Sequence, residues 1–138
     1  MSLTVAARRA FDFKVEDYSF ASQMAGFCES FQSDTFHVGG YDWAVRFSPD
    51  LGVSLKLVIL SKPKAVERVG VKFAFTLVDK SGKASAAVLQ KKCSMFFFKG
   101  QEEGFDYFMS KKDLGKYIHR DCFVVRCTVS VLRQPKRY

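Results

Sequence analysis

The amino-acid sequence predicts an all-β fold, an antiparallel β-sandwich of about eight strands with one or two short helical turns. Three observations lead to this fold class. Apolar and polar residues alternate along several segments, phenylalanine occurs fifteen times among 138 residues, and glycine or proline separates the segments. Alternation matches the two-residue period of a half-buried strand, and aromatic residues favour strands. A chain of this length can bury a hydrophobic core without a metal ion or a disulfide.

The first strands are predicted in the N-terminal third of the chain. Residues 11–16 alternate between apolar and charged side chains, and residues 42–47 repeat the pattern around Trp43. Between them, Gly39-Gly40 is typical of a tight turn that joins two strand segments. Both segments are therefore expected to bury one face and expose the other.

Four further segments are predicted as strands: residues 53–60, 71–77, 94–99 and 123–131. Pro63 ends the first of these, because proline cannot donate to a strand ladder. Phe96, Phe97 and Phe98 are consecutive, so they face both sides of their strand. This pattern predicts core filling plus one exposed ring, rather than a stacking platform for single-stranded nucleic acid.

The periodicity changes before the last strand. Phe105, Phe108 and Met109 fall at helical spacing, and the segment that runs from Ser110 to Asp113 resembles a helix N-cap box with Asp in place of Glu. One or two short helical turns are expected there.

A single domain is predicted over residues 10–132, with an N-terminal tail at residues 1–9 and a C-terminal tail or linker stub at residues 133–138. No repeat or low-complexity tract divides the chain. The net charge of +8 suits an acidic partner, nucleic acid included. The charge is spread along the chain, however, and Arg8 and Arg9 are assigned to the tail. No recognised basic motif accompanies the charge, so nucleic acid is not an expected partner.

The sequence offers no catalytic or metal-binding set. Its two histidines, His37 and His119, are each explained as a surface or hydrogen-bonded structural residue. Its four cysteines include no CxxC pair, which argues against a zinc site and for reduced thiols inside the cell. We therefore expect no enzyme activity, no cofactor and no metal. No apolar run approaches the roughly 20 residues that span a bilayer, so no membrane partner is expected, and the expected location is cytoplasmic or nuclear.

Four ordered segments carry a family resemblance: Ser33-Asp-Thr-Phe36, Val38-Gly-Gly-Tyr-Asp-Trp-Ala-Val-Arg-Phe-Ser-Pro-Asp50, Val71-Lys-Phe-Ala-Phe-Thr-Leu77 and Phe98-Lys-Gly-Gln-Glu-Glu-Gly-Phe-Asp-Tyr-Phe108. Together they resemble the MATH (TRAF-like) domain, most of all the MATH half of plant MATH-BTB proteins. The resemblance extends from about residue 11 to residue 132. It implies a sandwich that binds a short extended peptide in a shallow groove, by sheet surface and strand edge.

The resemblance also implies where the peptide binds. Phe73, Gly104 and Phe105 agree with the family's groove, whereas Lys56 and Met95 replace tyrosines and Glu103 replaces a tryptophan. Losing three rings removes apolar anchoring, so the preference of the groove is expected to change. If the ionic positions flank the groove, a ligand that carries charges of its own is expected. Core packing is the alternative role for Phe73, and solvated surface charge is the alternative role for the ionic positions. The expected peptide-binding residues are Lys56, Phe73, Met95, Gln101, Glu102, Glu103, Gly104, Phe105 and Asp106.

The function implied by the resemblance is noncovalent substrate recognition. In a MATH-BTB adaptor, a BTB domain outside this chain would engage a cullin-type ubiquitin ligase. Other settings for a MATH domain stay open, namely a free-standing regulator, a deubiquitinating protease or a receptor signalling trimer. A basic sandwich that binds nucleic acid is the alternative from a different class, and steep salt dependence would mark it.

Overall fold

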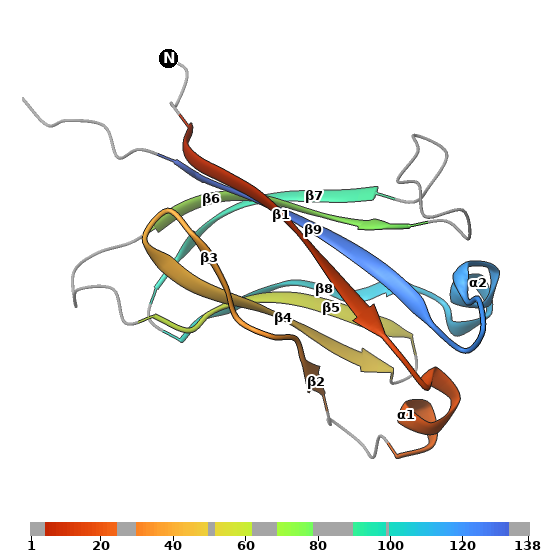
Figure 1. Cartoon of the computed structure of the whole chain (residues 1–138). Coiled ribbons are helices and arrows are strands. Elements are labelled where there is room, and N and C mark those ends of the chain that lie inside the picture. Colours follow the sequence, from red (N-terminus) through yellow and green to blue (C-terminus); the bar gives the residue numbers. More distant parts are fainter. Residues whose placement is uncertain are drawn as a thin grey trace, which may run out of the picture.

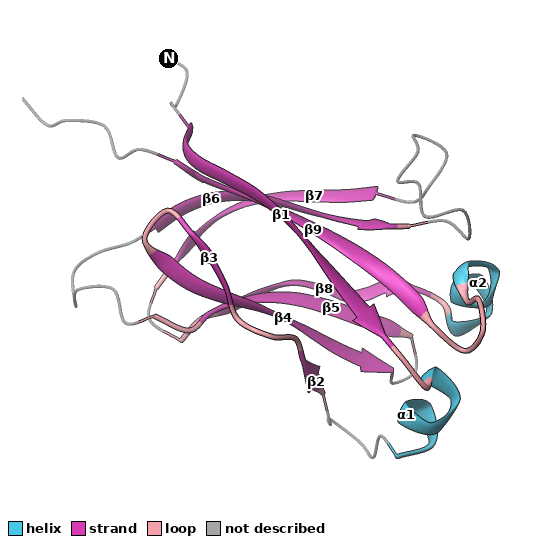
Figure 2. Ribbon diagram, viewed as in Figure 1, coloured by secondary structure: helices cyan, strands magenta, loops and turns pink. Residues whose placement is uncertain are grey.

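The protein forms two antiparallel sheets packed face to face (Figures 1 and 2), as seen in a computed structural model that describes residues 5–24, 30–49, 52–61, 69–78, 90–98 and 100–132. One sheet has four strands and the other has five. The sandwich that the sequence predicts is thus confirmed, with nine strands in the described part of the chain.

The four-stranded sheet has the order β1-β9-β6-β7, and every neighbouring pair is antiparallel. Its strands are β1 (Val5–Val15), β9 (Phe123–Leu132), β6 (Val69–Leu77) and β7 (Gln90–Phe97). The long strand β9 lies in the middle and pairs with β1 on one side and β6 on the other. Within the described residues, β1 and β7 are the end strands of this sheet.

The five-stranded sheet has the order β2-β4-β5-β8, and β3 also pairs with β4. Its strands are β2 (Phe31–Gln32), β3 (Phe36–Val38), β4 (Tyr41–Pro49), β5 (Val53–Ile59) and β8 (Glu102–Met109). Two short helices, α1 (Tyr18–Met24) and α2 (Lys111–Leu114), lie toward one end of the sandwich (Figure 1). A 3-10 turn, Gly115–Tyr117, follows α2.

The core lies between the sheets and is rich in aromatic rings. Strand β9 alternates strictly between buried and half-buried residues, as expected for a strand with one face in the core. Trp43, Phe47 and Phe75 are fully buried. The Trp43 ring lies edge-on to Phe97, with ring centroids 5.3 Å apart, and so joins the two sheets.

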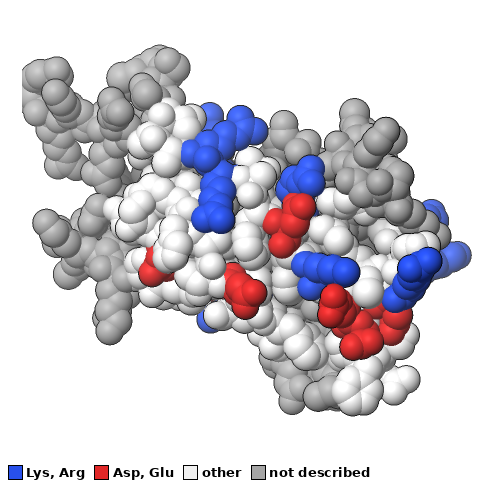
Figure 3. Space-filling model, in the orientation of Figure 1, with Lys and Arg blue, Asp and Glu red and all other residues white. Residues whose placement is uncertain are grey.

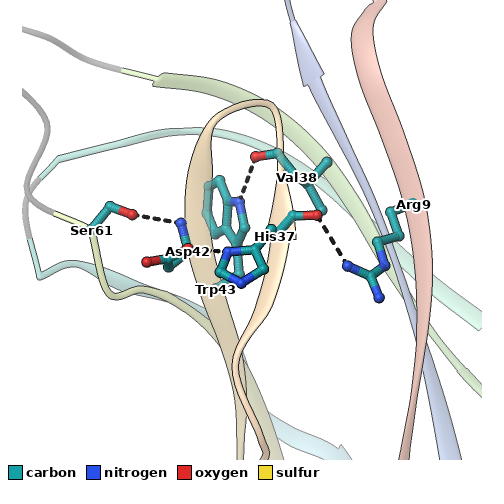
Figure 4. A network of polar contacts seen from close by, with 6 residues as sticks. All are labelled: Arg9, His37, Val38, Asp42, Trp43 and Ser61. Carbon is teal, nitrogen blue, oxygen red and sulfur yellow. Dashed lines mark hydrogen bonds and ion pairs between the residues drawn. The ribbon is translucent and has the colours of Figure 1, made fainter.

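The hairpin of β3 and β4 has the turn that the sequence predicts. Gly39 and Gly40 both have positive φ, at 63° and 83°, which is the geometry of a tight two-residue hairpin turn. Figure 4 shows how polar contacts hold this hairpin. The Trp43 indole N–H donates to the Val38 carbonyl at 3.1 Å, and an Arg9 N–H donates to the His37 carbonyl at 3.3 Å.

The first strand begins earlier than predicted. Residues 5–9, assigned to a tail on sequence grounds, pair with β9, and Val5 lies opposite Leu132. Arg8 and Arg9 therefore belong to a strand rather than to a solvated tail. The tail prediction was wrong here because the outer side of an end strand needs no apolar pattern.

The segment with helical spacing is a strand. Phe105, Phe108 and Met109 all lie in β8. Opposite them, Leu55 and Val53 are two residues apart on β5, whereas their partners Phe105 and Met109 are four residues apart on β8. This bulge turns residues three and four positions apart toward the same side, so it imitates the period of a helix.

The helix cap predicted at Ser110 is confirmed. The Ser110 hydroxyl accepts a hydrogen bond from the Asp113 backbone N–H at 3.0 Å at the start of α2. Helix α1 was not predicted. Its first turn is capped by Asp121, which accepts from the Ser19 backbone N–H at 3.0 Å across 102 residues of sequence. Because the capping residue is so far away in the sequence, no pattern of neighbouring residues predicts this helix.

The triple phenylalanine exposes two rings rather than the one expected. Phe97 is fully buried, whereas Phe96 is 51% exposed and Phe98 is 50% exposed. Phe98 lies just beyond the end of β7, so the alternation of the strand no longer governs it.

Candidate functional site

The candidate site lies along the margin of the sandwich where β7 and β8 meet. Each of these strands is the end strand of its own sheet in the described part of the chain, and the two contact each other. Their outer edges therefore open toward the same side of the molecule. Unpaired backbone groups at such an edge can hydrogen-bond to an extended peptide. We call this margin the β7–β8 seam, and its described side chains are those of Cys93, Gln101, Glu103 and Phe105.

The strand register aims three side chains at the seam. Cys93 lies opposite Phe73, Glu103 opposite Leu57, and Phe105 opposite Leu55. Directly paired residues point to the same face of a sheet, and these three partners are buried in the core. Cys93, Glu103 and Phe105 thus face the space between the sheets, at the margin where that space opens.

The Glu103 carboxylate is held in place by its neighbours. Glu103 Oε1 accepts a hydrogen bond from Gln101 Nε2 at 2.6 Å, and Gln101 Oε1 accepts one from the Phe98 backbone N–H at 3.1 Å. Burial, and then the negative charge of Glu103, raise the pKa of the Cys93 thiol. The seam therefore carries one oriented negative charge beside a protonated thiol.

Phe105 forms the apolar part of the seam. Its ring is half-buried and lies 6.3 Å from the Phe75 ring and 5.9 Å from the Phe108 ring, measured between centroids. Phe73 is only 2% exposed and belongs to the opposite sheet, with its centroid 5.7 Å from that of Phe75. The ring of Phe73 is therefore part of the core. It packs against Phe75, which in turn contacts Phe105 at the seam.

Lys56, Glu102 and Asp106 lie on the other side of β8, on the outer face of the five-stranded sheet. Lys56 Nζ is 2.5 Å from Asp106 Oδ1, and Glu102 Oε2 accepts from Arg46 at 2.7 Å. The hydrogen bond from Lys56, and then its charge, lower the pKa of Asp106. These pairs line a hollow of about 330 Å³ on β4, β5 and β8.

Gly104 lies on β8 between residues of the seam and residues of the outer face, and it has a structural role. A Cβ atom at this position would lie 2.3 Å from the Leu55 carbonyl oxygen and 2.9 Å from the Lys56 Cα. Strand β8 can therefore approach β5 closely only with glycine here.

The nine residues expected to bind a peptide thus divide between several places. Gln101, Glu103 and Phe105 meet at the seam, and Lys56, Glu102 and Asp106 meet on the outer face. Met95 pairs with Val71 in the backbone, and its side chain lies outside the part of the chain that the structure describes. Sequence reasoning missed Cys93 and Arg46, since Cys93 joins its group only through the packing of the two sheets and Arg46 only through strand pairing. The pattern in the sequence that could have indicated them is the alternation of side chains along their strands.

Other reactive groups form no site in the described ranges. His37 pairs with Asp42 on the exposed surface of the β3–β4 hairpin (Figure 4), and His119 is exposed. No group of three or more potential metal ligands occurs among the described residues. Burial strongly raises the pKa of Cys127, so this thiol stays protonated. No helix among the described residues is long and apolar enough to cross a membrane.

Comparison with known proteins identifies the family. The sequence model of the MATH domain matches residues 10–129. This chain belongs to the MATH domain family. The match spans both sheets, from β1 to β9, and includes every side chain of the seam.

Several plant relatives of this MATH domain are known. It is 33% identical over 147 aligned positions to BTB/POZ and MATH domain-containing protein 3 of Arabidopsis thaliana, covering 91% of this chain. It is 29% identical to protein 5 of the same series and 28% identical to protein 4, covering 95% and 96% of this chain. The chain spans 35%, 35% and 31% of the length of these three relatives. It is therefore similar to the MATH part of proteins that also carry a BTB domain.

Proposed function

We propose that this MATH domain binds an extended segment of a partner protein along the β7–β8 seam, and that it recruits that partner to a cullin-type ubiquitin ligase as part of a MATH-BTB adaptor. The binding proposal rests on one observation: two open strand edges lie together beside a half-buried ring. Backbone groups along β7 and β8 supply affinity for an extended chain, and Phe105 supplies an apolar anchor. The relatives that combine MATH and BTB domains support the adaptor role.

The charge of Glu103 indicates which kind of ligand the seam would bind. Its carboxylate is oriented by Gln101 and has no basic partner among the described side chains. A segment with lysine or arginine next to an apolar residue would complement this charge and the Phe105 ring. Selection by a charge at the seam would act mainly on specificity.

A peptide array tests the seam. Arrays of extended peptides should be bound by the wild-type protein, and Phe105→Ala should weaken the best of them about tenfold or more in a fluorescence anisotropy titration. Phe20→Ala is the matched control, because Phe20 is 63% exposed on α1, away from the seam. Equal binding by wild type and Phe105→Ala, with both proteins folded by circular dichroism, would remove Phe105 from the site.

The same array tests the charge of the ligand. Glu103→Gln keeps the shape of the side chain and removes its charge, whereas Glu103→Lys reverses the charge. Preference for lysine- and arginine-containing peptides should weaken in the first variant and invert in the second. An unchanged preference would leave the peptide site in place and refute the role of Glu103 in selection.

The adaptor role has its own test. The reading frame beyond the Tyr138 codon in the transcript should encode a BTB domain. The protein translated from that frame should co-purify with a cullin when the two are co-expressed. A frame that ends without a BTB domain would favour a free-standing regulator.

A further inference from the structure

The outer face of the four-stranded sheet carries a row of side chains that the seam does not use. Arg8 on β1 lies opposite Ser130 on β9, Ser130 lies opposite Lys72 on β6, and Lys72 lies opposite Ser94 on β7. All four point outward, since they alternate with buried neighbours such as Val129 and Val131. The Cα atoms of Arg8 and Lys72 are thus about 10 Å apart, two strand spacings, with one short hydroxyl side chain between them.

The next row along the same face has short side chains on β1, β9 and β6, and it continues on β7 to Lys92, which lies opposite Ala74. Ala10 lies opposite Thr128, and Thr128 lies opposite Ala74. Two long cationic side chains beside a row of short ones leave a concavity. A hollow of about 470 Å³ is present here, and it is lined by Arg8, Lys72, Phe73, Ala74, Cys93, Ser94, Thr128 and Ser130. We call it the β9 hollow.

The β9 hollow carries positive charge that the protein does not neutralise. Most other basic side chains on described strands have an acidic partner, in the pairs Lys14–Glu16, Arg46–Glu102, Lys56–Asp106 and Arg126–Asp12. No acidic side chain among the described residues pairs with Arg8 or Lys72. The nearest carboxylate along β1, Asp12, already accepts from Arg126 at 2.8 Å and 3.2 Å with both of its oxygens.

The charge pattern on the surface agrees with this. In Figure 3, basic side chains gather over the upper part of β1, whereas charges of both signs mix farther along the strand toward α1. Two cations that share a hollow repel each other weakly in water, and an anionic group between them relieves that repulsion. The hydroxyls of Ser130 and Thr128 can donate to the same anion.

An apolar surface borders the hollow on one side. Phe96 is 51% exposed, and its ring lies across Gly70, where an added Cβ would be 3.5 Å from the ring and 3.7 Å from Leu132. An exposed ring next to paired cations suits a ligand that carries carboxylates beside an apolar side chain.

We propose that the β9 hollow is a second binding surface, which takes an acidic segment of a partner protein with its carboxylates between Arg8 and Lys72 and an apolar side chain against Phe96. Cys93 borders both surfaces, but the side chains of Ser94 and Phe96 alternate with it along β7 and so lie on the outer face, whereas the seam lies at the inner face. The proposal does not rest on peptide binding at the seam. Its ligand has the opposite charge to the one that Glu103 would select.

The test compares two double charge reversals in the whole chain. A fluorescently labelled peptide with a central leucine flanked by aspartate and glutamate is titrated at low and at moderate salt. Arg8→Glu with Lys72→Glu should weaken binding about tenfold, because two attractive contacts become repulsive. Lys111→Glu with Lys112→Glu changes the net charge equally on the exposed α2 and should change binding less than twofold.

Two further measurements complete the test. Arg8→Gln with Lys72→Gln should also weaken binding, by a smaller factor, and it guards against misfolding of the charge-reversed protein. Amide shifts in a nitrogen-15 spectrum should centre on Thr128 and Ser130, and Phe105→Ala should leave acidic-peptide binding unchanged. Equal losses in both double reversals would show nonspecific attraction and overturn the proposal. Tighter binding of a single-stranded oligonucleotide that displaces the peptide would overturn it in favour of nucleic acid.

Discussion

Gly104 determines how closely β8 can approach β5. A side chain there would collide with the backbone of Leu55 and Lys56, which cannot move without breaking the pairing of the two strands. The family resemblance places this glycine in a binding groove, and the geometry gives a physical reason for it that involves no ligand. At the scale of the residue, the close approach at Gly104 positions the neighbours Glu103 and Phe105.

Replacing Gly104 by alanine should therefore destabilise the protein by about 2 kcal/mol, through overpacking against backbone atoms. Gly115→Ala is the matched control. Nothing lies within 4 Å of a Cβ at Gly115, and its φ of −54° is helical, so this change should be close to neutral. Urea denaturation of both variants measures the difference. Equal stability of the two would mean that β8 can shift outward freely.

Strand β8 shows how one element can serve two surfaces. Alternation sends Glu103 and Phe105 to the seam, and it sends Glu102 to the outer face of the five-stranded sheet. The bulge that follows returns Phe108 and Met109 to the core. At the scale of the element, neighbours in sequence are thus not neighbours on the surface.

Helix α2 follows β8 and depends on a single cap. It has four residues, and it places Leu114 fully in the core. Ser110→Ala removes the hydroxyl that accepts from the Asp113 N–H, and it should cost about 1 kcal/mol. Ser110→Asn retains an acceptor and should restore most of that stability in thermal unfolding. If the alanine variant were as stable as wild type, water would be satisfying the end of the helix just as well.

Across the whole molecule, aromatic rings connect the sheets to the candidate site. Phe75 is fully buried on β6, and its ring contacts Phe73 in its own sheet and Phe105 and Phe108 in the other. A substitution of Phe75 therefore affects the packing of both the core and the seam.

Phe75→Ala should lower the free energy of unfolding by about 3–5 kcal/mol, because it leaves a large cavity between the sheets. Phe75→Leu should cost less and should stay folded, so that peptide binding at the seam can be measured in it. Phe20→Ala removes an exposed ring and should change stability by less than about 0.5 kcal/mol. Chemical denaturation compares the three, and a small effect at Phe75 would indicate that the core can collapse around the gap.

Much of the fold could be predicted from local patterns. The strand around Trp43, the Gly39-Gly40 turn and the cap at Ser110 each depend on a few consecutive residues, and each was confirmed, although Ala44 on the face expected to be exposed is buried. The start of β1 and the whole of α1 could not be predicted, because their partners are distant. Leu132 pairs with Val5, and Asp121 caps the turn at Ser19. The bulge in β8 was misinterpreted because it imitates a helical period.

The sequence by itself determined the class of fold, the family and the residue types available at the candidate site. Only the tertiary structure decided which of those residues share a surface. The packing of the two sheets brought Cys93 to Glu103 and buried the ring of Phe73. Strand pairing brought Arg8 near Lys72, and alternation placed Glu102 and Glu103 on opposite sides of one strand. The physical reason is that side chains alternate along a strand and align across strands, so a surface is assembled by register between segments far apart in the chain.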